Sequence, residues 1–274
     1  MKLKNKTAFI SGASRGIGLE IAKKFASEGA NIVIVAKTGT PHPKLEGTVY
    51  SAAKEIEALG GKALPCVVDI REEEQVNAAV QLAVSTFGGI DILVNNASAI
   101  QLTGTLETEM KRYDLMNQVN ARGTYLCAKA CLPYLLKSDN PHVITLSPPL
   151  NMEAKWFKHH VAYSMAKFGM SMVTLGMSAE FEGKVAFNSL WPKTIIATAA
   201  IEFAVGNAEM LKLARKPNIM ADAAFEIVQK DAKIFSGHFL IDEEVLKAAG
   251  LQDFERYKND PSVSDQQLIP DFFI

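Results

Sequence analysis

Short apolar runs alternate with longer amphipathic stretches along the whole chain. The apolar runs are rich in Val, Ile, Leu, Ala or Phe and cover residues 7–11, 31–36, 63–68, 91–95, 142–146, 185–190 and 237–242. Between them, apolar residues recur at helical spacing, most clearly over 17–28, 50–59, 72–87, 108–136 and 161–181. This alternation of strands and helices predicts a parallel sheet with helices on both faces.

The predicted fold class is α/β, with one Rossmann-type doubly wound domain over residues 1–274 and one strand for each of the seven apolar runs. Residues 1–140 roughly form a cofactor half, and residues 141–274 form a catalytic and substrate-lid half. No repeat or long linker divides the chain. Ligands of such folds bind beyond the carboxyl ends of the strands, so we expect Gly12, Asp69 and Ser147 to converge there.

A glycine-rich turn follows the first predicted strand. It reads Gly12-Ala13-Ser14-Arg15-Gly16-Ile17-Gly18, and helical periodicity begins at Ile17. The first turn of a helix leaves backbone N–H groups unpaired, and these groups suit a pyrophosphate. Glycine lets the backbone approach such a ligand closely because it has no Cβ. The turn from Gly12 to Gly18 is therefore predicted to bind a dinucleotide.

Tyr163 and Lys167 are four residues apart in the predicted helix 161–181, which places both on one helical face. A free tyrosine has a pKa of about 10, and a neighbouring cation lowers that pKa because it favours the phenolate. The pair is thus suited to proton exchange with a carbonyl or an alcohol. A half-buried tyrosine beside a solvated lysine is the plainer interpretation of the same spacing.

Composition and charge narrow the partners. The chain has 274 residues, 48% of them hydrophobic, and its 29 basic and 30 acidic residues give no argument for nucleic acid or an anionic membrane as partner. No apolar run approaches the roughly 20 residues that span a bilayer, so we expect a cytoplasmic protein without a membrane span. Cys66, Cys127 and Cys131 are few, odd in number and without metal-ligand spacing. Cys127 and Cys131 are four residues apart in one predicted helix, so we expect them to be small buried hydrophobic residues and not a disulfide or metal pair.

Taken together, four elements resemble the short-chain dehydrogenase/reductase family over nearly the whole chain. They are the glycine turn, Asn95-Asn96-Ala97, Asn120, and Ser147 with Tyr163 and Lys167. Residues 38–50 and 146–150 further resemble one subgroup, whose larger members carry an additional sterol-carrier domain at the carboxyl end. This chain is expected to be a bacterial-type version that contains the dehydrogenase domain alone.

The resemblance implies an oxidoreductase that interconverts a carbonyl and an alcohol, with the hydride carried by a nicotinamide cofactor. Tyr163 would be the general acid in reduction and the base in the reverse direction. Lys167 would lower the pKa of Tyr163 and bind the nicotinamide ribose, and Ser147 would stabilise charge on the substrate oxygen. Asn120 would bind a water that links Lys167 to solvent.

The end of the second predicted strand indicates which dinucleotide binds. NAD enzymes of this architecture place an acidic residue there, but this chain has Lys37. Lys37 and Arg15 are cations that suit a 2′-phosphate, so the cofactor is predicted to be NADP rather than NAD. Asp69 resembles the family position that holds the adenine amino group and could also cap the next helix, and Asn96 is predicted to contact the cofactor.

A substrate lid is predicted from Thr194 to Leu213, where apolar residues indicate a lipophilic carbonyl or alcohol, fatty acyl or steroid-like. Packing of a helix pair onto the sheet explains these residues equally well. Small residues in the helix 161–181 predict a homodimer or homotetramer, and the tail 257–274 is expected to pack along the surface. Two other functions stay open: a catalytically weak NADP-binding redox sensor, and a sugar-nucleotide epimerase or dehydratase.

Overall fold

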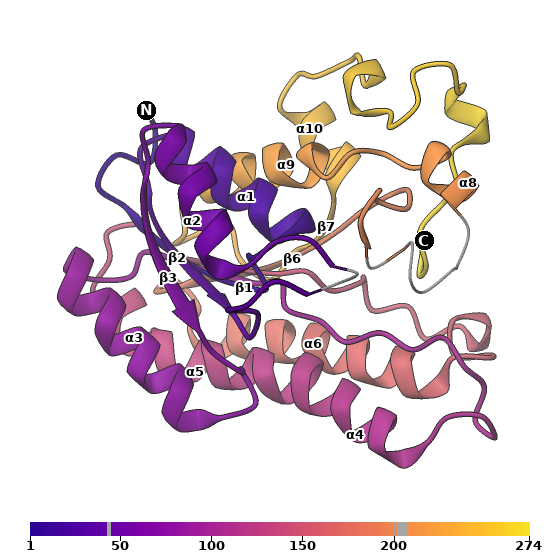
Figure 1. Cartoon of the computed structure of the whole chain (residues 1–274), viewed down its shortest axis with the longest axis horizontal. Coiled ribbons are helices and arrows are strands. Elements are labelled where there is room, and N and C mark those ends of the chain that lie inside the picture. The colour runs from indigo at the N-terminus through magenta and orange to yellow at the C-terminus, as the bar shows by residue number, and fades with distance from the viewer. Residues whose placement is uncertain (43–44, 200, 202–207) are drawn as a thin grey trace.

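The computed structural model describes residues 1–42, 45–199, 201 and 208–274 and contains one parallel sheet of seven strands (Figure 1). The strand order is β3-β2-β1-β4-β5-β6-β7. The strands are β1 (Thr7–Ser11), β2 (Asn31–Ala36), β3 (Lys62–Val67), β4 (Ile92–Asn95), β5 (His142–Thr145), β6 (Ala186–Trp191) and β7 (Phe239–Ile241). All neighbouring pairs are parallel, which confirms the predicted fold class.

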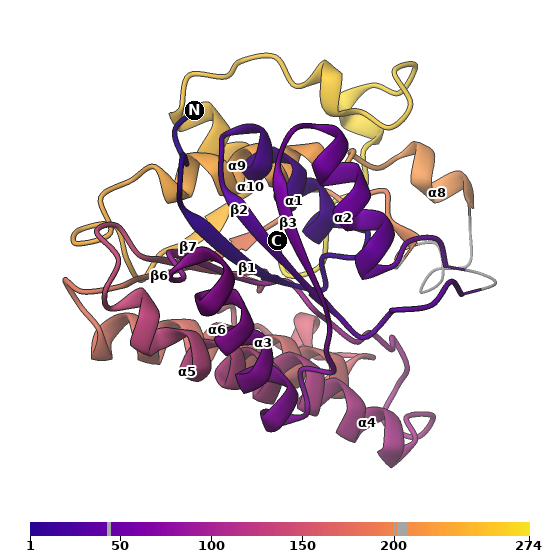
Figure 2. The ribbon, with the colours of Figure 1, turned by 60° about the vertical axis from the view of Figure 1, so that its left-hand side comes forward.

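Helices cover both faces of this sheet (Figures 1 and 2). One face carries α1 (Gly16–Ser27), α2 (Val49–Ala58), α9 (Asn218–Val228) and α10 (Asp242–Ala248). The other carries α3 (Glu73–Phe87), α4 (Met110–Asn117), α5 (Gly123–Leu135) and α6 (Val161–Glu180). The short helix α8 (Ala208–Lys212) and single helical turns at Ala154–Trp156, Glu255–Tyr257 and Asp265–Gln267 lie in the connections.

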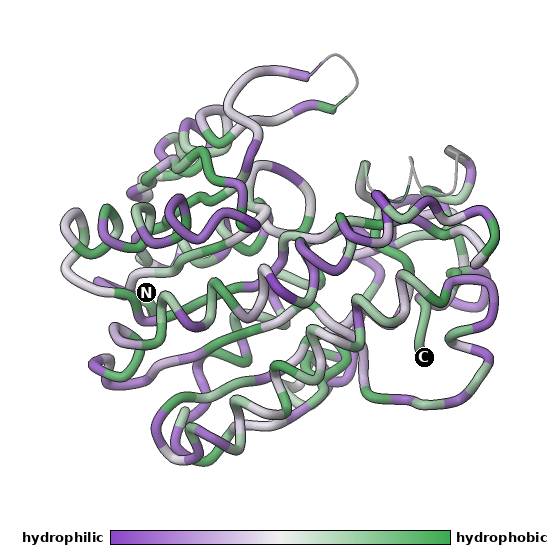
Figure 3. Tube along the Cα trace, turned by 90° about the horizontal axis from the view of Figure 1, so that it is seen from below, coloured by the Kyte–Doolittle hydropathy of each residue, from purple (hydrophilic) through white to green (hydrophobic). Residues whose placement is uncertain are grey.

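Each strand supplies side chains to two cores. In β1, Ala8 and Ile10 pack against the side of α1 and α9, whereas Phe9 packs against the side of α3 and α5. Successive residues of a strand point to opposite faces of the sheet, and helices cover both faces, so all three side chains are fully buried. Figure 3 shows hydrophobic and hydrophilic segments alternating along the outer helices, as expected of helices that bury only one side.

The predicted single helix 108–136 is interrupted. It begins as α4, continues through a π-helical turn over Gln118–Arg122, and resumes as α5. Asn120 lies in this turn and is fully buried. A π-helical turn inserts an extra residue and so rotates the following side chains, which apolar periodicity alone does not reveal. The amphipathic pattern therefore predicted the helix but missed its break.

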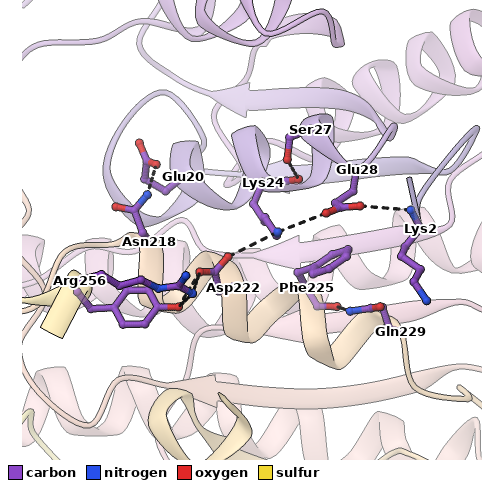
Figure 4. A network of polar contacts seen from close by, with 11 residues as sticks. Lys2, Glu20, Lys24, Ser27, Glu28, Asn218, Asp222, Phe225, Gln229 and Arg256 are labelled. Atoms are coloured by element: carbon purple, nitrogen blue, oxygen red, sulfur yellow. Dashed lines mark hydrogen bonds and ion pairs between the residues drawn. The ribbon is translucent and has the colours of Figure 1, made fainter. Parts of the chain in front are cut away.

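Two elements near the carboxyl end were not predicted, namely α9 and α10. A polar network fastens α9 to α1 at the outer surface (Figure 4). Lys24 Nζ lies 3.4 Å from Glu28 and 3.7 Å from Asp222, and Asp222 also binds Arg256 at 3.2 Å.

The carboxyl-terminal tail, residues 257–274, bends back past this network. Its expected course along the surface is wrong at its end, where Phe273 is buried with 3% exposure.

Candidate active site

The side-chain amide of Asn96 fixes the start of the glycine turn by hydrogen bonds. Asn96 Nδ2 donates to the carbonyl oxygens of Ser11 at 2.9 Å and Gly12 at 3.0 Å. Gly12 has a φ of +69°, and a Cβ at Gly12 would lie 2.7 Å from the same Nδ2 atom, while a Cβ at Gly18 would contact it even more closely. The Asn96 amide nitrogen thus supports the turn from beneath, which differs from its predicted contact with the cofactor.

The remaining residues of the turn build a cradle above this support. Ala13 and Ser14 are buried, and Gly16 has a φ of +59°, a conformation that side chains disfavour. Gly16, Ile17 and Gly18 form the first turn of α1, so their N–H groups lie at the positive end of the helix dipole. This arrangement fits a pyrophosphate.

Arg15 is occupied by the segment that follows β2. Its Nε donates to the carbonyl of Glu46 at 2.7 Å, and a terminal nitrogen donates to the carbonyl of Gly47 at 2.5 Å. Burial lowers the pKa of Arg15 from its usual value. The guanidinium therefore fastens residues 45–50 over the glycine turn, while Lys37 remains exposed at the end of β2. Of residues 38–50, which resemble the subgroup, residues 43–44 fall outside the described part.

Asp69 lies beyond the end of β3 and is bound by Arg71. The Arg71 guanidinium donates to both carboxylate oxygens at 2.6 to 3.0 Å, and these bonds lower the pKa of Asp69. The helix begins only at Glu73, so Asp69 closes a local turn through the Arg71 N–H at 3.0 Å and does not cap α3. The capping role predicted for Asp69 is therefore wrong.

Tyr163 and Lys167 lie one turn apart in α6 and are buried, with exposures of 6% and 3%. Lys167 Nζ donates to the carbonyl of Leu146 at 2.7 Å and lies 4.9 Å from the centre of the Trp191 ring. Burial lowers the pKa of Lys167 to about 7, although the Asp271 carboxyl opposes this change. With a pKa near neutral pH, Lys167 carries its positive charge for only part of the time at pH 7, so it is a weaker cation than the sequence suggested.

The expected lowering of the Tyr163 pKa is not found in this structure. Burial raises the pKa of Tyr163, and the negative charge of Asp271 raises it further. Removing the phenol from water disfavours the phenolate, and this effect exceeds any help from the partly neutral Lys167. The phenol is therefore poised as a proton donor, the form needed to protonate a carbonyl oxygen.

Ser147 immediately follows Leu146, so it lies one residue from the carbonyl that binds Lys167. Its side chain is completely buried, and its Oγ has no hydrogen-bond partner within the described residues. Asn95, at the end of the adjacent strand β4, is also buried, with both amide atoms unpartnered in the same part of the chain. Buried polar atoms usually have partners, so this edge of the sheet has donors and acceptors to offer a ligand.

Asn120 reaches a different partner from the one predicted. Its Oδ1 accepts from the Ala99 N–H at 2.7 Å, and its Nδ2 donates to the Ala99 carbonyl at 3.0 Å. The amide therefore fixes the loop that follows Asn95-Asn96-Ala97, which brings α4, α5 and β4 together. The side-chain amide keeps a second N–H and a second lone pair, so the water expected at Asn120 stays a prediction.

Sequence reasoning missed the contribution of the carboxyl end. Phe273 packs among aromatic rings that include Tyr163, with ring centres 6.4 Å apart, and Asp271 acts electrostatically on both Tyr163 and Lys167. The adjacent aromatic pair Phe272-Phe273 was the available signal, because two phenylalanines side by side need a buried partner. Seven residues of the predicted lid, 200 and 202–207, fall outside the described residues.

A parallel sheet with a glycine turn after β1 and a buried tyrosine and lysine pair beside β5 is the arrangement of one family of oxidoreductases. The family model described as short chain dehydrogenase matches residues 6–206. The chain belongs to the short-chain dehydrogenase family, whose members use NAD or NADP.

Relatives within that family are close. The chain is 59% identical over 273 residues to hydroxysteroid dehydrogenase-like protein 2 of Danio rerio, which confirms the subgroup expected from residues 38–50 and 146–150. The match covers 100% of this chain but 65% of that relative, so the chain spans slightly less than two thirds of that protein's length. A solved structure from Xanthomonas campestris is 54% identical, with a TM-score of 0.96, covering 100% of this chain and 99% of that one. A short chain dehydrogenase of Mycobacterium thermoresistibile is 48% identical, with a TM-score of 0.93, covering 99% and 96%.

Proposed function

We propose that the protein is an NADP-dependent oxidoreductase that interconverts a lipophilic carbonyl compound and its alcohol. The observation that carries this proposal is the buried group of Ser147, beyond the carboxyl end of β5, with Tyr163 and Lys167 in the first two turns of α6. A proton donor, a cation and an unpartnered hydroxyl in one place are what carbonyl reduction needs.

A bound reduced nicotinamide would supply the hydride. In the reduction, the Tyr163 hydroxyl donates its proton to the substrate oxygen as charge develops there. Ser147 Oγ donates a hydrogen bond to the same oxygen, at no cost to an existing bond because it has no partner within the described residues. Lys167 stabilises the phenolate that remains and, after turning from Leu146, binds the ribose hydroxyls.

NADP is proposed over NAD because of the charges at the end of β2. Lys37 is exposed there, and no carboxylate lies between Val35 and Thr38 to hold a ribose diol. Arg15 is less available for a 2′-phosphate than predicted, since its guanidinium binds Glu46 and Gly47. Lys37→Asp is expected to weaken NADPH binding about tenfold relative to NADH, which corresponds to about one exposed charge contact.

The lipophilic substrate is proposed from the aromatic surroundings of Tyr163 and from the relatives named hydroxysteroid dehydrogenase-like. A homodimer or homotetramer is proposed as well, because α6 exposes apolar side chains at helical spacing, among them Met165, Met172 and Leu175. Met172→Lys is expected to lower the mass measured by light scattering. None of the described helices has the length and hydropathy of a membrane span.

The test measures NADPH oxidation with a panel of lipophilic ketones and aldehydes, using native protein and Tyr163→Phe. Native protein is expected to turn over at least one compound, and Tyr163→Phe to lose at least about 10³-fold in rate while it still binds NADPH. NADPH binding without turnover of any compound would favour the redox sensor instead. Equal rates in the two proteins would refute the role of Tyr163.

A further inference from the structure

The carboxyl-terminal segment 269–273 is paired with the chain that follows β6. The Asp271 N–H donates to the carbonyl of Lys193 at 3.0 Å, and the Trp191 Nε1–H donates to the carbonyl of Phe272 at 2.7 Å. Trp191 is also the ring beneath the Lys167 ammonium, at 4.9 Å. One side chain therefore contacts both the terminal segment and the catalytic lysine.

Phe273 lies among the aromatic side chains around Tyr163. Its ring centre is 5.1 Å from that of Phe168, 5.8 Å from that of Trp191 and 6.4 Å from that of Tyr163. Its φ is +73°, which is uncommon for a bulky residue. Such a backbone conformation persists only where surrounding contacts fix it, and these often lie at functional sites. The packing of Phe273 thus limits how the Tyr163 ring can move.

The same segment brings a carboxyl group to the catalytic pair. Asp271 attracts the charged form of Lys167 and opposes the phenolate of Tyr163. Its Oδ1 accepts the Phe272 N–H at 2.7 Å, which fixes the carboxyl in place. Burial raises the pKa of the Asp271 carboxyl to about 7. Besides Lys167, the other charged group that acts on this carboxyl is Asp242. Asp271 therefore carries its charge mainly above neutral pH.

We propose that segment 269–273 belongs to the acid–base machinery, with two positioning residues. Phe273 fixes the ring of Tyr163 through the aromatic contacts, and Asp271 is held in place by its bonds to Lys193 and Phe272, on the segment that Trp191 joins to Lys167. This inference rests on the proposed function, because it assigns the segment to the same reaction. It predicts that removing the Asp271 charge makes both groups lose their protons at lower pH.

The first test is the pH dependence of ketone reduction in Asp271→Asn and Asp271→Glu. Reduction needs the protonated phenol, so its rate falls at alkaline pH as Tyr163 ionises. In Asp271→Asn this fall is expected about one pH unit lower, since a nearby like charge no longer opposes ionisation. Asp271→Glu should retain the native profile. Asp139→Asn is the control, because the Asp139 side chain is fully exposed and its ion pair is with Lys6, at 4.0 Å.

The second test needs no turnover. The chain has two tryptophans, Trp156 and Trp191, and Phe273 lies within 5.9 Å of both rings. The Lys167 ammonium lies over Trp191, so its loss of a proton should change the emission of the full chain. The midpoint of that change is expected at lower pH in Asp271→Asn and unchanged in Asp139→Asn.

Phe273→Leu tests the aromatic contact. It is expected to lower kcat about tenfold with KM within about twofold, since it loosens the proton donor more than the binding of substrate. Phe273→Tyr should restore kcat because the ring is retained. Circular dichroism checks that each variant is folded.

The outcomes separate the two proposals. If native protein shows no turnover but the emission midpoint shifts in Asp271→Asn, the proposed function fails and the role of Asp271 stands. If native protein turns over ketone but neither the rate profile nor the emission midpoint moves, the role of Asp271 is refuted. A Phe273→Leu variant with native kcat would refute the role of Phe273.

Discussion

Gly18→Ala tests how the glycine turn is built. A Cβ at Gly18 would lie 2.7 Å from the Gly12 carbonyl oxygen and 3.1 Å from Ala13 Cα, and it would contact Asn96 Nδ2. Two of these neighbours are backbone atoms and cannot move aside cheaply. Adding one methyl group to such a packed place costs about 1–3 kcal/mol. The substitution should therefore be destabilising even though alanine suits a helix.

The displaced Asn96 amide adds to this cost. Asn96 Nδ2 donates to Ser11 and Gly12, and each hydrogen bond contributes about 1 kcal/mol to stability. The higher helix propensity of alanine offsets up to about 1 kcal/mol. Combining these amounts, Gly18→Ala should lower the free energy of unfolding by about 3 kcal/mol. Because the cradle itself is distorted, NADPH affinity should fall as well.

The assay is urea denaturation followed by circular dichroism, with NADPH affinity measured by titration. Gly89→Ala is the matched control, since nothing lies within 4 Å of a Cβ at Gly89 and its φ is outside the left-handed region. That control should change the free energy of unfolding by no more than about 0.5 kcal/mol. If Gly18→Ala were as stable as Gly89→Ala and bound NADPH as tightly as native protein, the reasoning about the turn would be wrong.

Three further predictions concern buried groups. Burial lowers the pKa of His142 to about 4, so its neutral form stabilises the fold fully above pH 6.5. About 3 kcal/mol of the free energy of unfolding should be lost as pH falls to 4. In urea denaturation at several pH values, His142→Gln should reduce the dependence of the free energy of unfolding on pH. Asn120→Ala should lower the free energy of unfolding by about 2–3 kcal/mol, measured in the same way, because it leaves the N–H and carbonyl of Ala99 unpaired. Burial raises the pKa of Cys66 to about 11 and that of Cys127 to about 12. A thiol reagent at pH 8 should therefore label these two thiols only after the protein unfolds, and fast labelling of the folded protein would contradict their burial.

Much of the fold could be predicted because the five inner strands of the sheet are buried on both faces. Each strand of the sheet reads as a short apolar run, and the predicted bounds lie within about two residues of those in the structure. Cys127 and Cys131 are buried, as predicted. By contrast, α9 was missed although eight of its eleven residues are buried, because a helix that is apolar on most sides lacks a clear amphipathic period.

The candidate site also has a part that the sequence predicted correctly and a part that it did not. Motif spacing correctly brought the glycine turn, Ser147 and the pair of Tyr163 and Lys167 to one edge of the sheet, since strand order and helical pitch fix those positions. Spacing says nothing of burial, however. The pKa of Tyr163 was therefore predicted in the wrong direction, because that direction depends on desolvation and on Asp271, which is remote in sequence.

The most direct measurement of the central claim is a single turnover with NADPH that carries deuterium at both hydrogen positions of the nicotinamide C4 atom. Native protein should transfer deuterium to the carbonyl carbon of a lipophilic ketone, and the alcohol formed should contain one deuterium on that carbon. With Tyr163→Phe, transfer should be slower by at least about 10³-fold at unchanged NADPH affinity. Alcohol formed without deuterium, or equal transfer rates in the two proteins, would contradict the account.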